Sequence, residues 1–281
     1  MAAPATSSST SVSSHSHGGR KCGTHISAAR KAAHEAKFAR VAKQKSAKAK
    51  KNPVIDVHFH VVAANKTRAG GWIASRQIHH QIDVLNRDFH RTGIRYKLAN
   101  TTHTISKSWF LDVAPDSVEQ TRMKESLRSG SEGTLNIYTV SFANTAAAGL
   151  LGYSTFPADY QGLPKDDGVV IQHETLPGGS LKPFNKGRTA THEVGHWVGL
   201  YHTFQGESCT STGDMVADTP VQKSPTSGCP KKRPDTCPGQ KGLDAIHNYM
   251  DYSDDACLNQ FTPGQATRMR AQLRTYRGIN V

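Results

Sequence analysis

Residues 191–202 read Thr-His-Glu-Val-Gly-His-Trp-Val-Gly-Leu-Tyr-His, and they are the most informative stretch of the sequence. His192 and His196 are four residues apart, so on a helix their imidazoles project from the same face, one turn apart. Gly199 permits a left-handed turn that ends the helix and swings the chain back. His202 can thereby approach the first two histidines. The stretch predicts a helix, a glycine turn and three converging imidazoles.

Three neutral imidazoles with an open fourth position are the ligand set of a catalytic zinc ion. Glu193 is adjacent to the first histidine and reaches past the metal, where it can take a proton from an attacking water. The alternative for a bare His-Glu-x-x-His pattern is an amphipathic helix with histidines on its polar face. Because Gly199 and His202 complete the longer pattern, the sequence favours the zinc site.

The region before this motif predicts a mixed order of strands and helices. Alternating apolar residues from Ile55 to Val61 are typical of a half-buried strand, which places His58 and His60 on its polar face and not at a metal. Apolar residues then recur at helical spacing from Ile78 to Phe89. Further strands are expected at 94–104, 134–142 and 169–171, and a further helix at 117–128.

The last predicted helix carries three start signals. Thr262 is a capping residue, Pro263 occupies the first helical position, and Gln265 follows the cap by three residues. Apolar residues from Met269 to Tyr276 form one stripe. We expect this helix to dock on the core.

Most of the charge of the chain is local. The 281 residues are 36% hydrophobic and carry a formal net charge of +13, without a run of 18 apolar residues that could span a membrane. Residues 1–51 hold eleven Lys or Arg and one acid, Glu35. We therefore expect a basic, largely disordered tail at 1–51 and a folded domain at 52–281. Specific nucleic-acid binding is not expected, because no binding signature accompanies the charge.

Cysteine usage indicates an oxidising compartment. Cys209, Cys229, Cys237 and Cys257 lie in a Pro- and Gly-rich region without a Cys-x-x-Cys pair. Two disulfides fit this pattern better than a zinc ribbon, although four cysteines permit three pairings. Sequons at Asn65 and Asn100 are consistent with secretion. The first ten residues show no signal peptide, so either the protein is intracellular or a signal has been removed, and the cysteines favour removal.

Two motifs together resemble a known protease class. The pattern from His192 to His202 resembles the metzincin zinc signature, and Asn248-Tyr249-Met250-Asp251-Tyr252-Ser253 resembles the associated Met-turn. The fuller text, with "HEVGHWVGLYHTF", "GDMVADTP" and "HNYMDYSDDAC", resembles the pappalysin family, particularly its ulilysin-like and secreted fungal members. The resemblance is strong over 188–275, weaker over 54–188 and sparse in the tail.

The resemblance implies an α+β, metzincin-like fold. Its members have a twisted mixed β-sheet with backing and active-site helices in an upper subdomain, here 52–199. An irregular, disulfide-bonded lower subdomain follows, here 200–281, and the active-site cleft lies between the two. The family pattern pairs Cys209 with Cys237 and Cys229 with Cys257.

The resemblance also assigns roles to single residues. Met250 forms a hydrophobic floor beneath the zinc, and the Tyr252 hydroxyl stabilises the oxyanion. An acid at Asp254 or Asp255 receives a basic side chain just after the scissile bond; surface charge or calcium ligation are the alternatives. A structural calcium is implied near Asp214, Asp218 and Thr219, for which solvated turn residues are the alternative.

Cys22 resembles the prosegment cysteine of this family within Arg20-Lys21-Cys22-Gly23-Thr24. A thiolate there can take the fourth zinc position and exclude water. The alternative is an incidental free cysteine. Under the switch hypothesis residues 1–51 form a pro-region, and the run 43–51 suits self-cleavage before basic residues.

Taken together, the sequence predicts a secreted zinc endopeptidase, made as a zymogen and working as a monomer on proteins or peptides. It predicts no membrane partner. One alternative is a non-catalytic binding protein that retains the zinc fold, against which Glu193 argues. The other is polyanion binding through the basic tail.

Overall fold

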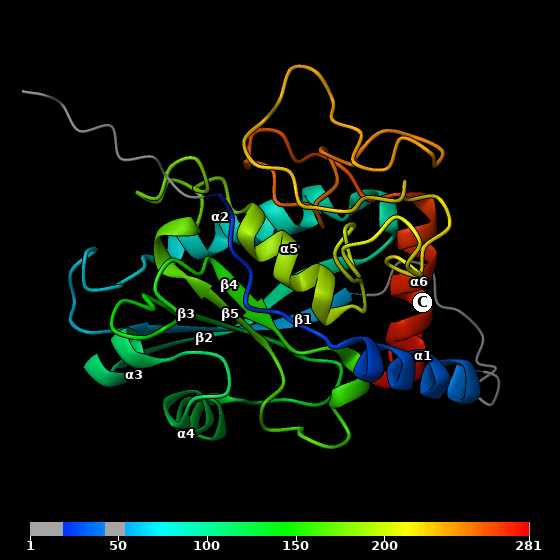
Figure 1. The fold of residues 1–281 in the computed structure, drawn as a ribbon. Coiled ribbons are helices and arrows are strands. Elements are labelled where there is room, and N and C mark those ends of the chain that lie inside the picture. The colour runs from blue at the N-terminus through cyan, green and yellow to red at the C-terminus, as the bar shows by residue number, and fades with distance from the viewer. Residues whose placement is uncertain (1–18, 43–53, 281) are drawn as a thin grey trace, which may run out of the picture.

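The computed structural model describes residues 19–42 and 54–280, and its centre is a five-stranded mixed sheet (Figure 1). The strand order is β2-β1-β3-β5-β4, and β4 pairs antiparallel to β5 at one edge. This confirms the predicted mixed sheet. The strands are β1 (Val54–Ala63), β2 (Arg95–Ile105), β3 (Leu135–Val140), β4 (Gly152–Ser154) and β5 (Val169–Gln172).

Helices cover both faces of the sheet (Figure 1). One face packs against α2 and α5, while α3 contacts β1 and β3 on the other face and packs on α4. Two clusters of buried apolar residues, one on each face, form the core. The helices are α1 (Ala28–Ala42), α2 (Ser75–Asp88), α3 (Lys107–Asp112), α4 (Val118–Leu127), α5 (Arg188–Trp197) and α6 (Pro263–Arg277), with short 3-10 turns at η1 (His90–Thr92), η2 (Pro157–Asp159) and η3 (His173–Thr175).

The prediction of a polar face on the first strand is wrong for His60. His60 is only 1% exposed, because α3 and α4 cover the face on which it lies. Its ring stacks on Tyr138 and its nitrogens bond the side chains of Thr102 and Asn136. Burial lowers the pKa of His60 to about 4, so the ring is neutral. His58 is partly buried against Ser129.

The C-terminal helix begins as predicted. Thr262 and Gln265 form a reciprocal capping box around Pro263, and Met269 and Leu273 are fully buried. The helices predicted at 78–89 and 117–128 and the three further strands are also present. The short elements α3 and β4 were not predicted, because six and three residues carry little periodic signal.

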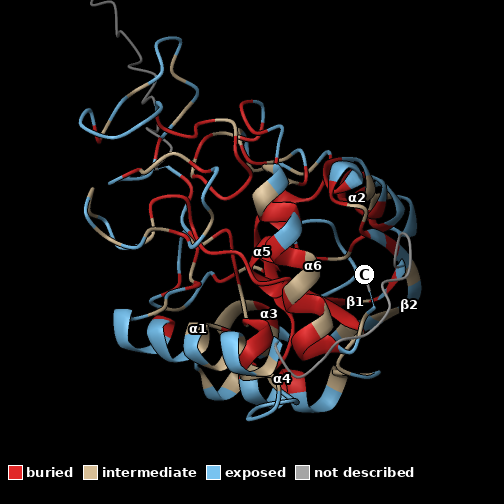
Figure 2. Ribbon diagram, turned by 90° about the vertical axis from the view of Figure 1, so that its right-hand side faces the viewer, coloured by how far each residue is buried: buried red, intermediate tan, exposed pale blue. Residues whose placement is uncertain are grey.

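The prediction of a largely disordered N-terminal tail is wrong for residues 19–42. They run past α5 and the edge strand β4 and end in α1, whose inner side packs on α6 while its outer side is exposed (Figures 1 and 2). The expected disorder of the first eighteen residues concerns a segment outside the described residues. The same is true of the basic run at 43–51.

Residues 200–261 contain isolated bridges and turns in place of helices and strands. Disulfides join Cys209 to Cys237 and Cys229 to Cys257 within this region. Within the described residues, no helix has both the length and the apolar character needed to cross a membrane.

A buried ion pair ties the end of the chain to the sheet and the active-site helix. Arg277 donates two hydrogen bonds of 3.0 Å to the Asp167 carboxylate and a third to the carbonyl of Trp197. Its guanidinium also lies 3.6 Å from the centroid of the Trp197 ring. Both charged side chains are at most 1% exposed, so each depends on the other for compensation.

Replacing Arg277 with Ala is expected to lower the free energy of unfolding by about 3–5 kcal/mol, because it leaves the Asp167 carboxylate buried without its main partner. Urea unfolding followed by far-UV circular dichroism measures the change. Arg91→Ala, on the exposed face of η1, is the matched control and should change the free energy by less than about 0.5 kcal/mol. A cost below about 1 kcal/mol for Arg277→Ala would contradict this account.

Candidate metal centre

The local backbone brings the three predicted histidines together. His192 and His196 lie on one face of α5, and Gly199 follows with φ +102°. A side chain at Gly199 is excluded twice, since a Cβ there would also lie 2.4 Å from Cγ of Gln272 on α6. The turn returns His202 to the face that holds the first two rings.

The three imidazoles face one another through their Nε2 atoms. Nε2 of His202 lies 3.1 Å from that of His196 and 3.2 Å from that of His192. Nδ1 of His192 lies 2.7 Å from the carbonyl of Tyr249, and Nδ1 of His196 lies 2.8 Å from that of Leu200. These carbonyls require a proton on Nδ1, so the Nε2 atoms carry lone pairs. Burial lowers the pKa of all three rings and keeps them neutral.

A cation between these atoms would satisfy the lone pairs of His192 and His196 and the Nε2 atom of His202 together. The Sγ atom of Cys22 completes the group at 3.6 Å from Nε2 of His196, and all four ligand atoms lie within 4.8 Å of one another. A tetrahedral zinc ion with Zn–N of roughly 2.0–2.1 Å and Zn–S of about 2.3 Å has N···N edges of about 3.3 Å and N···S edges of about 3.6 Å. The donor set therefore fits zinc in both chemistry and size.

Cys22 reaches this centre because its segment pairs with the edge strand β4. Its bridge to Gly152 is parallel, and the amide of Gly23 donates to the Gly152 carbonyl at 2.8 Å. The thiol is buried and donates to Oε2 of Glu193 at 3.3 Å. Burial raises the pKa of the Cys22 thiol, whereas a bound cation acts in the opposite direction. From the sequence, the position of this thiol beside the histidines could be predicted only through the family resemblance.

Glu193 lies at the centre of the same group and is 1% exposed. Its Oε2 also accepts a hydrogen bond of 3.1 Å from Thr24. Burial raises the pKa of Glu193 to about 7, and the hydrogen bonds from Cys22 and Thr24 oppose this rise. Gly152 makes room for the carboxylate, since a Cβ there would lie 2.9 Å from Cγ of Glu193.

Met250 and Tyr252 approach the centre from the Met-turn. Met250 is fully buried, and a Cβ on Gly195 would lie only 2.4 Å from its Sδ atom. Sequence reasoning did not identify Gly195 as a required glycine, although its place between the two histidines was a usable signal. The Tyr252 ring lies 5.1 Å from that of His202, and its hydroxyl interacts with the backbone of Cys22. Burial raises the pKa of Tyr252, so the hydroxyl stays protonated.

A buried acid pocket lies beside the centre and holds Arg20. The guanidinium donates to Oδ1 of Asp255 at 2.5 Å, to Thr189 at 3.2 Å and to the carbonyl of Ser253 at 3.4 Å. Phe184 lies over the same guanidinium, 5.1 Å from it. Arg20 was not predicted as a site residue. A lone arginine in a basic segment gives no signal from which this contact could have been found.

The second predicted acid and the calcium residues lie apart from this pocket. Asp254 is partly exposed and makes no ion pair within the described part of the chain. Asp218 accepts from the Thr262 hydroxyl and the Gly264 amide at the start of α6. Asp214 accepts from the Thr219 hydroxyl at 2.7 Å. Calcium binding here stays a prediction.

Comparisons with known proteins identify the family of the chain. The peptidase M43 family model, described as pregnancy-associated plasma protein-A, matches residues 116–274. An extracellular metalloprotease of Verticillium alfalfae is 47% identical over 265 residues, which cover 91% of this chain and 89% of that protein.

Two solved structures from Tannerella forsythia are similar in fold. A mutant of promirolysin has a TM-score of 0.74 at 31% identity, with 92% of this chain and 95% of that chain covered. Mature mirolysin in complex with a cleaved peptide has a TM-score of 0.66 at 32% identity, with 83% and 97% covered. The family match spans more than half of the chain and confirms the resemblance to the pappalysins. The chain therefore belongs to the M43 peptidase family, and it is a zinc metalloendopeptidase.

Proposed function

We propose that this chain is a secreted, monomeric zymogen whose processed form cleaves proteins or peptides before Arg or Lys. One observation carries the proposal: the chain's own N-terminal segment lies in the cleft, with Arg20 on Asp255 and Cys22 against the three histidines. A basic side chain and a metal-binding thiol thus occupy adjacent parts of one site. The segment marks where a substrate binds and prevents its binding.

His192, His196 and His202 would hold the zinc ion, with Cys22 as fourth ligand in the unprocessed chain. When bound, zinc supplies a Lewis acid that polarises the peptide carbonyl and makes water more acidic. Glu193 takes the proton of the attacking water and delivers a proton to the leaving amine. Its buried carboxylate suits both proton transfers. The hydrogen bond that it accepts from Thr24 is present only while the N-terminal segment is docked.

Tyr252 is proposed to support the oxyanion that forms on the substrate carbonyl. Its protonated hydroxyl is a hydrogen-bond donor, and while the segment is docked the same hydroxyl interacts with the backbone of Cys22. Phe204 packs against the Tyr252 ring with centroids 4.8 Å apart and fixes its direction.

The direction of the docked segment would protect it from cleavage at this point. A substrate with its basic residue on Asp255 places the residues before the scissile bond on the opposite side of the metal centre. The N-terminal segment instead runs from Arg20 to Thr24, with the reverse polarity, and pairs in parallel with β4. Its peptide groups therefore meet the centre in the wrong order for hydrolysis.

A second contact holds the segment down through α1. Glu35 accepts hydrogen bonds of 2.6 and 3.0 Å from Arg268 on α6 and one of 3.0 Å from the Tyr201 hydroxyl. Lys31 donates to the Thr212 hydroxyl and to the carbonyl of Gly213. The charges of this segment thus make specific contacts with the catalytic domain, which supports a pro-region over a polyanion-binding tail.

The comparisons support secretion and processing. The fungal relative is named as extracellular, and the sequon asparagines Asn65 and Asn100 are exposed. The mature form of mirolysin covers less of this chain than promirolysin does, 83% against 92%. That difference is in the direction expected if residues 1–51 are a pro-region.

Glu193→Gln is expected to lower kcat/KM of the processed enzyme by about 10²–10⁴-fold, because the amide keeps the shape of the carboxylate but cannot accept the proton. Cleavage of a fluorogenic peptide measures the loss. The zinc content, measured by atomic emission, should stay at about one ion per chain. A variant that keeps more than about a tenth of wild-type activity would exclude Glu193 as the base.

Cys22→Ala should raise the activity of the uncut chain at least about tenfold, because the fourth ligand is lost. Arg20 and α1 remain docked, so full processing should raise it further. The assay uses a short peptide, and intact mass at the time of measurement shows that the chain is uncut. Lys21→Ala, an exposed neighbour, is the control and should leave the activity at the low level of the parent. Equal activity of Cys22→Ala and the parent would disprove the switch.

Asp255→Asn should reduce the preference for Arg over Leu after the scissile bond at least about tenfold, because the buried guanidinium loses its counter-charge. The measurement is the ratio of kcat/KM for two peptides that differ only at that position. The control, Asp254→Asn, removes the same charge from the adjacent residue and should change the ratio little. A larger effect at Asp254 than at Asp255 would assign specificity to the other acid.

A further inference from the structure

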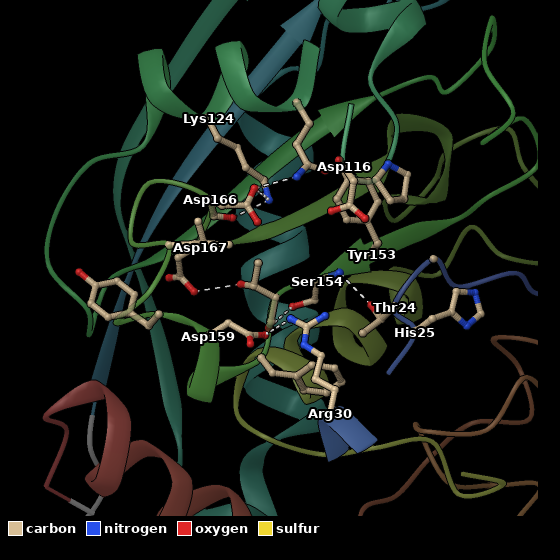
Figure 3. Close-up of a pocket in the computed structure, with 17 residues that line it drawn as sticks. Thr24, His25, Arg30, Asp116, Lys124, Tyr153, Ser154, Asp159, Asp166 and Asp167 are labelled. Atoms are coloured by element: carbon tan, nitrogen blue, oxygen red, sulfur yellow. Dashed lines mark hydrogen bonds and ion pairs between the residues drawn. The ribbon is translucent and has the colours of Figure 1, made fainter. Parts of the chain in front are cut away.

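A polar cavity of about 340 Å³ lies between the docked N-terminal segment and the catalytic domain (Figure 3). One wall is formed by Gly23, Thr24, His25 and Arg30 of the segment. The other wall continues from the end of β4 through η2. Arg30 and Asp159 lie toward one end, and Asp116 and Lys124 toward the other (Figure 3).

The catalytic-domain wall is rich in hydrogen-bond acceptors. Asp116, Asp159 and Asp166 line it, and Lys124 is already bound to the Asp166 carboxylate at 3.0 Å. Oε1 of Gln120, a side chain that is 4% exposed, has no hydrogen-bond partner among the described residues. An unpartnered buried acceptor is costly, and a ligand that donates hydrogen bonds would satisfy it. The cavity therefore suits a cationic donor.

The chain itself supplies such a donor in its unprocessed form. Arg30 forms an ion pair of 2.9 Å with Asp159, and His34 donates to the same carboxylate at 3.0 Å. Lys37 adds a hydrogen bond of 3.0 Å to the carbonyl of Ala158. Three basic side chains of α1 thus converge on η2. If residues 1–51 leave on processing, Asp159 loses its contacts with both Arg30 and His34.

A bound metal ion explains the cavity poorly. In the part of the chain that the structure describes, the group formed by Cys22 and the three histidines is the only one found in which three or more His, Cys, Asp or Glu ligand atoms converge. The cavity acids are spread along its length, and the Lys124 ammonium lies among them (Figure 3). An elongated cation with its charge at one end fits this arrangement better.

The position of the cavity relative to the metal centre defines which part of a substrate reaches it. This step rests on the proposed function, in which the residue after the scissile bond enters the Asp255 pocket. Residues before the bond then extend along β4, an edge strand free to pair with an extended peptide once the segment has gone. A strand advances about 3.3 Å per residue, so roughly two to four residues lead from the centre to the cavity beyond Ser154.

We propose that this cavity is a second specificity site, in which Asp159 binds an Arg or Lys side chain of the substrate roughly two to four residues before the scissile bond. Arg30 occupies the cation position of this site in the unprocessed chain. The enzyme would thus recognise two basic residues of the substrate, one on each side of the bond that it cuts.

The test uses processed enzyme, made from the zinc-loaded full chain by limited trypsin cleavage within residues 43–51 and freed of the N-terminal fragment. Peptides share Arg after the scissile bond and carry Arg, Ala or Glu at each of the second to fourth positions before it. At one position, the Arg-to-Ala ratio of kcat/KM should be roughly three- to tenfold in the wild type. It should fall to about one in Asp159→Asn.

Charge reversal provides the second variant. Asp159→Arg should favour Glu over Arg at the same position, which a merely structural role of Asp159 would not produce. Both variants should keep the Arg-to-Leu preference after the bond, which shows that the Asp255 pocket is intact. Asp83→Asn, an exposed charge on α2, is the control and should match the wild type in every ratio.

A wild-type Arg-to-Ala ratio near one at all three positions would overturn the proposal, as would a preference that persists in both Asp159 variants. These outcomes differ from failure of the proposed function. In that case the wild type would show no preference for a basic residue after the scissile bond, whatever precedes it.

Discussion

The convergence of three imidazole nitrogens on one point is the constraint on which the rest of this structure depends. Nε2 of His202 lies 3.1 Å from that of His196 and 3.2 Å from that of His192, a spacing that matches the edges of a tetrahedral zinc site. Each of two rings is held from behind by a carbonyl, one from Tyr249 in the Met-turn and one from Leu200 after the glycine turn. Two segments some fifty residues apart in the sequence must therefore be fixed with respect to one helix.

The C-terminal helix provides much of that fixation. Arg268 and Arg277 of α6 donate to the carbonyls of Gly199 and Trp197, at the C-terminal end of α5. These carbonyls have no partner within their own helix, and cations are favoured at this end of the helix dipole. Gln272, between the two arginines, packs where Gly199 lacks a side chain. One helix thus shapes the turn that delivers the third histidine.

The sequence could predict the parts of the fold that repeat with a regular period or use local chemistry. The histidine motif, the long helices and the capping box of α6 belong to this group. The burial of His60 could not be predicted, because it depends on α3 and α4, which cover the second face of the sheet from elsewhere in the chain. The packing of α1 on the domain could not be predicted for a related reason. Its helix is mostly polar, and its contacts are ion pairs and hydrogen bonds with residues more than 120 positions away.

The candidate site shows the same division between local and distant information. Spacing alone brought His192, His196 and His202 together, whereas Arg20 meets Asp255 across 235 residues of sequence. Gly152 and Gly195 are intermediate examples. Each glycine can be seen in the sequence, but its role depends on the atoms that would collide with a Cβ. A glycine inside a helix is a visible anomaly, but only the fold shows that the Met250 sulfur is what requires it.

The ion pair between Glu35 and Arg268 has a consequence for how the proposed inhibition would end. While α1 and β1 belong to one continuous chain, docking of the segment is an intramolecular equilibrium with a high effective concentration. A cut between them makes it a bimolecular equilibrium, in which the same contacts must hold a separate peptide. The fraction of enzyme that remains blocked then depends on protein concentration, so dilution alone favours release.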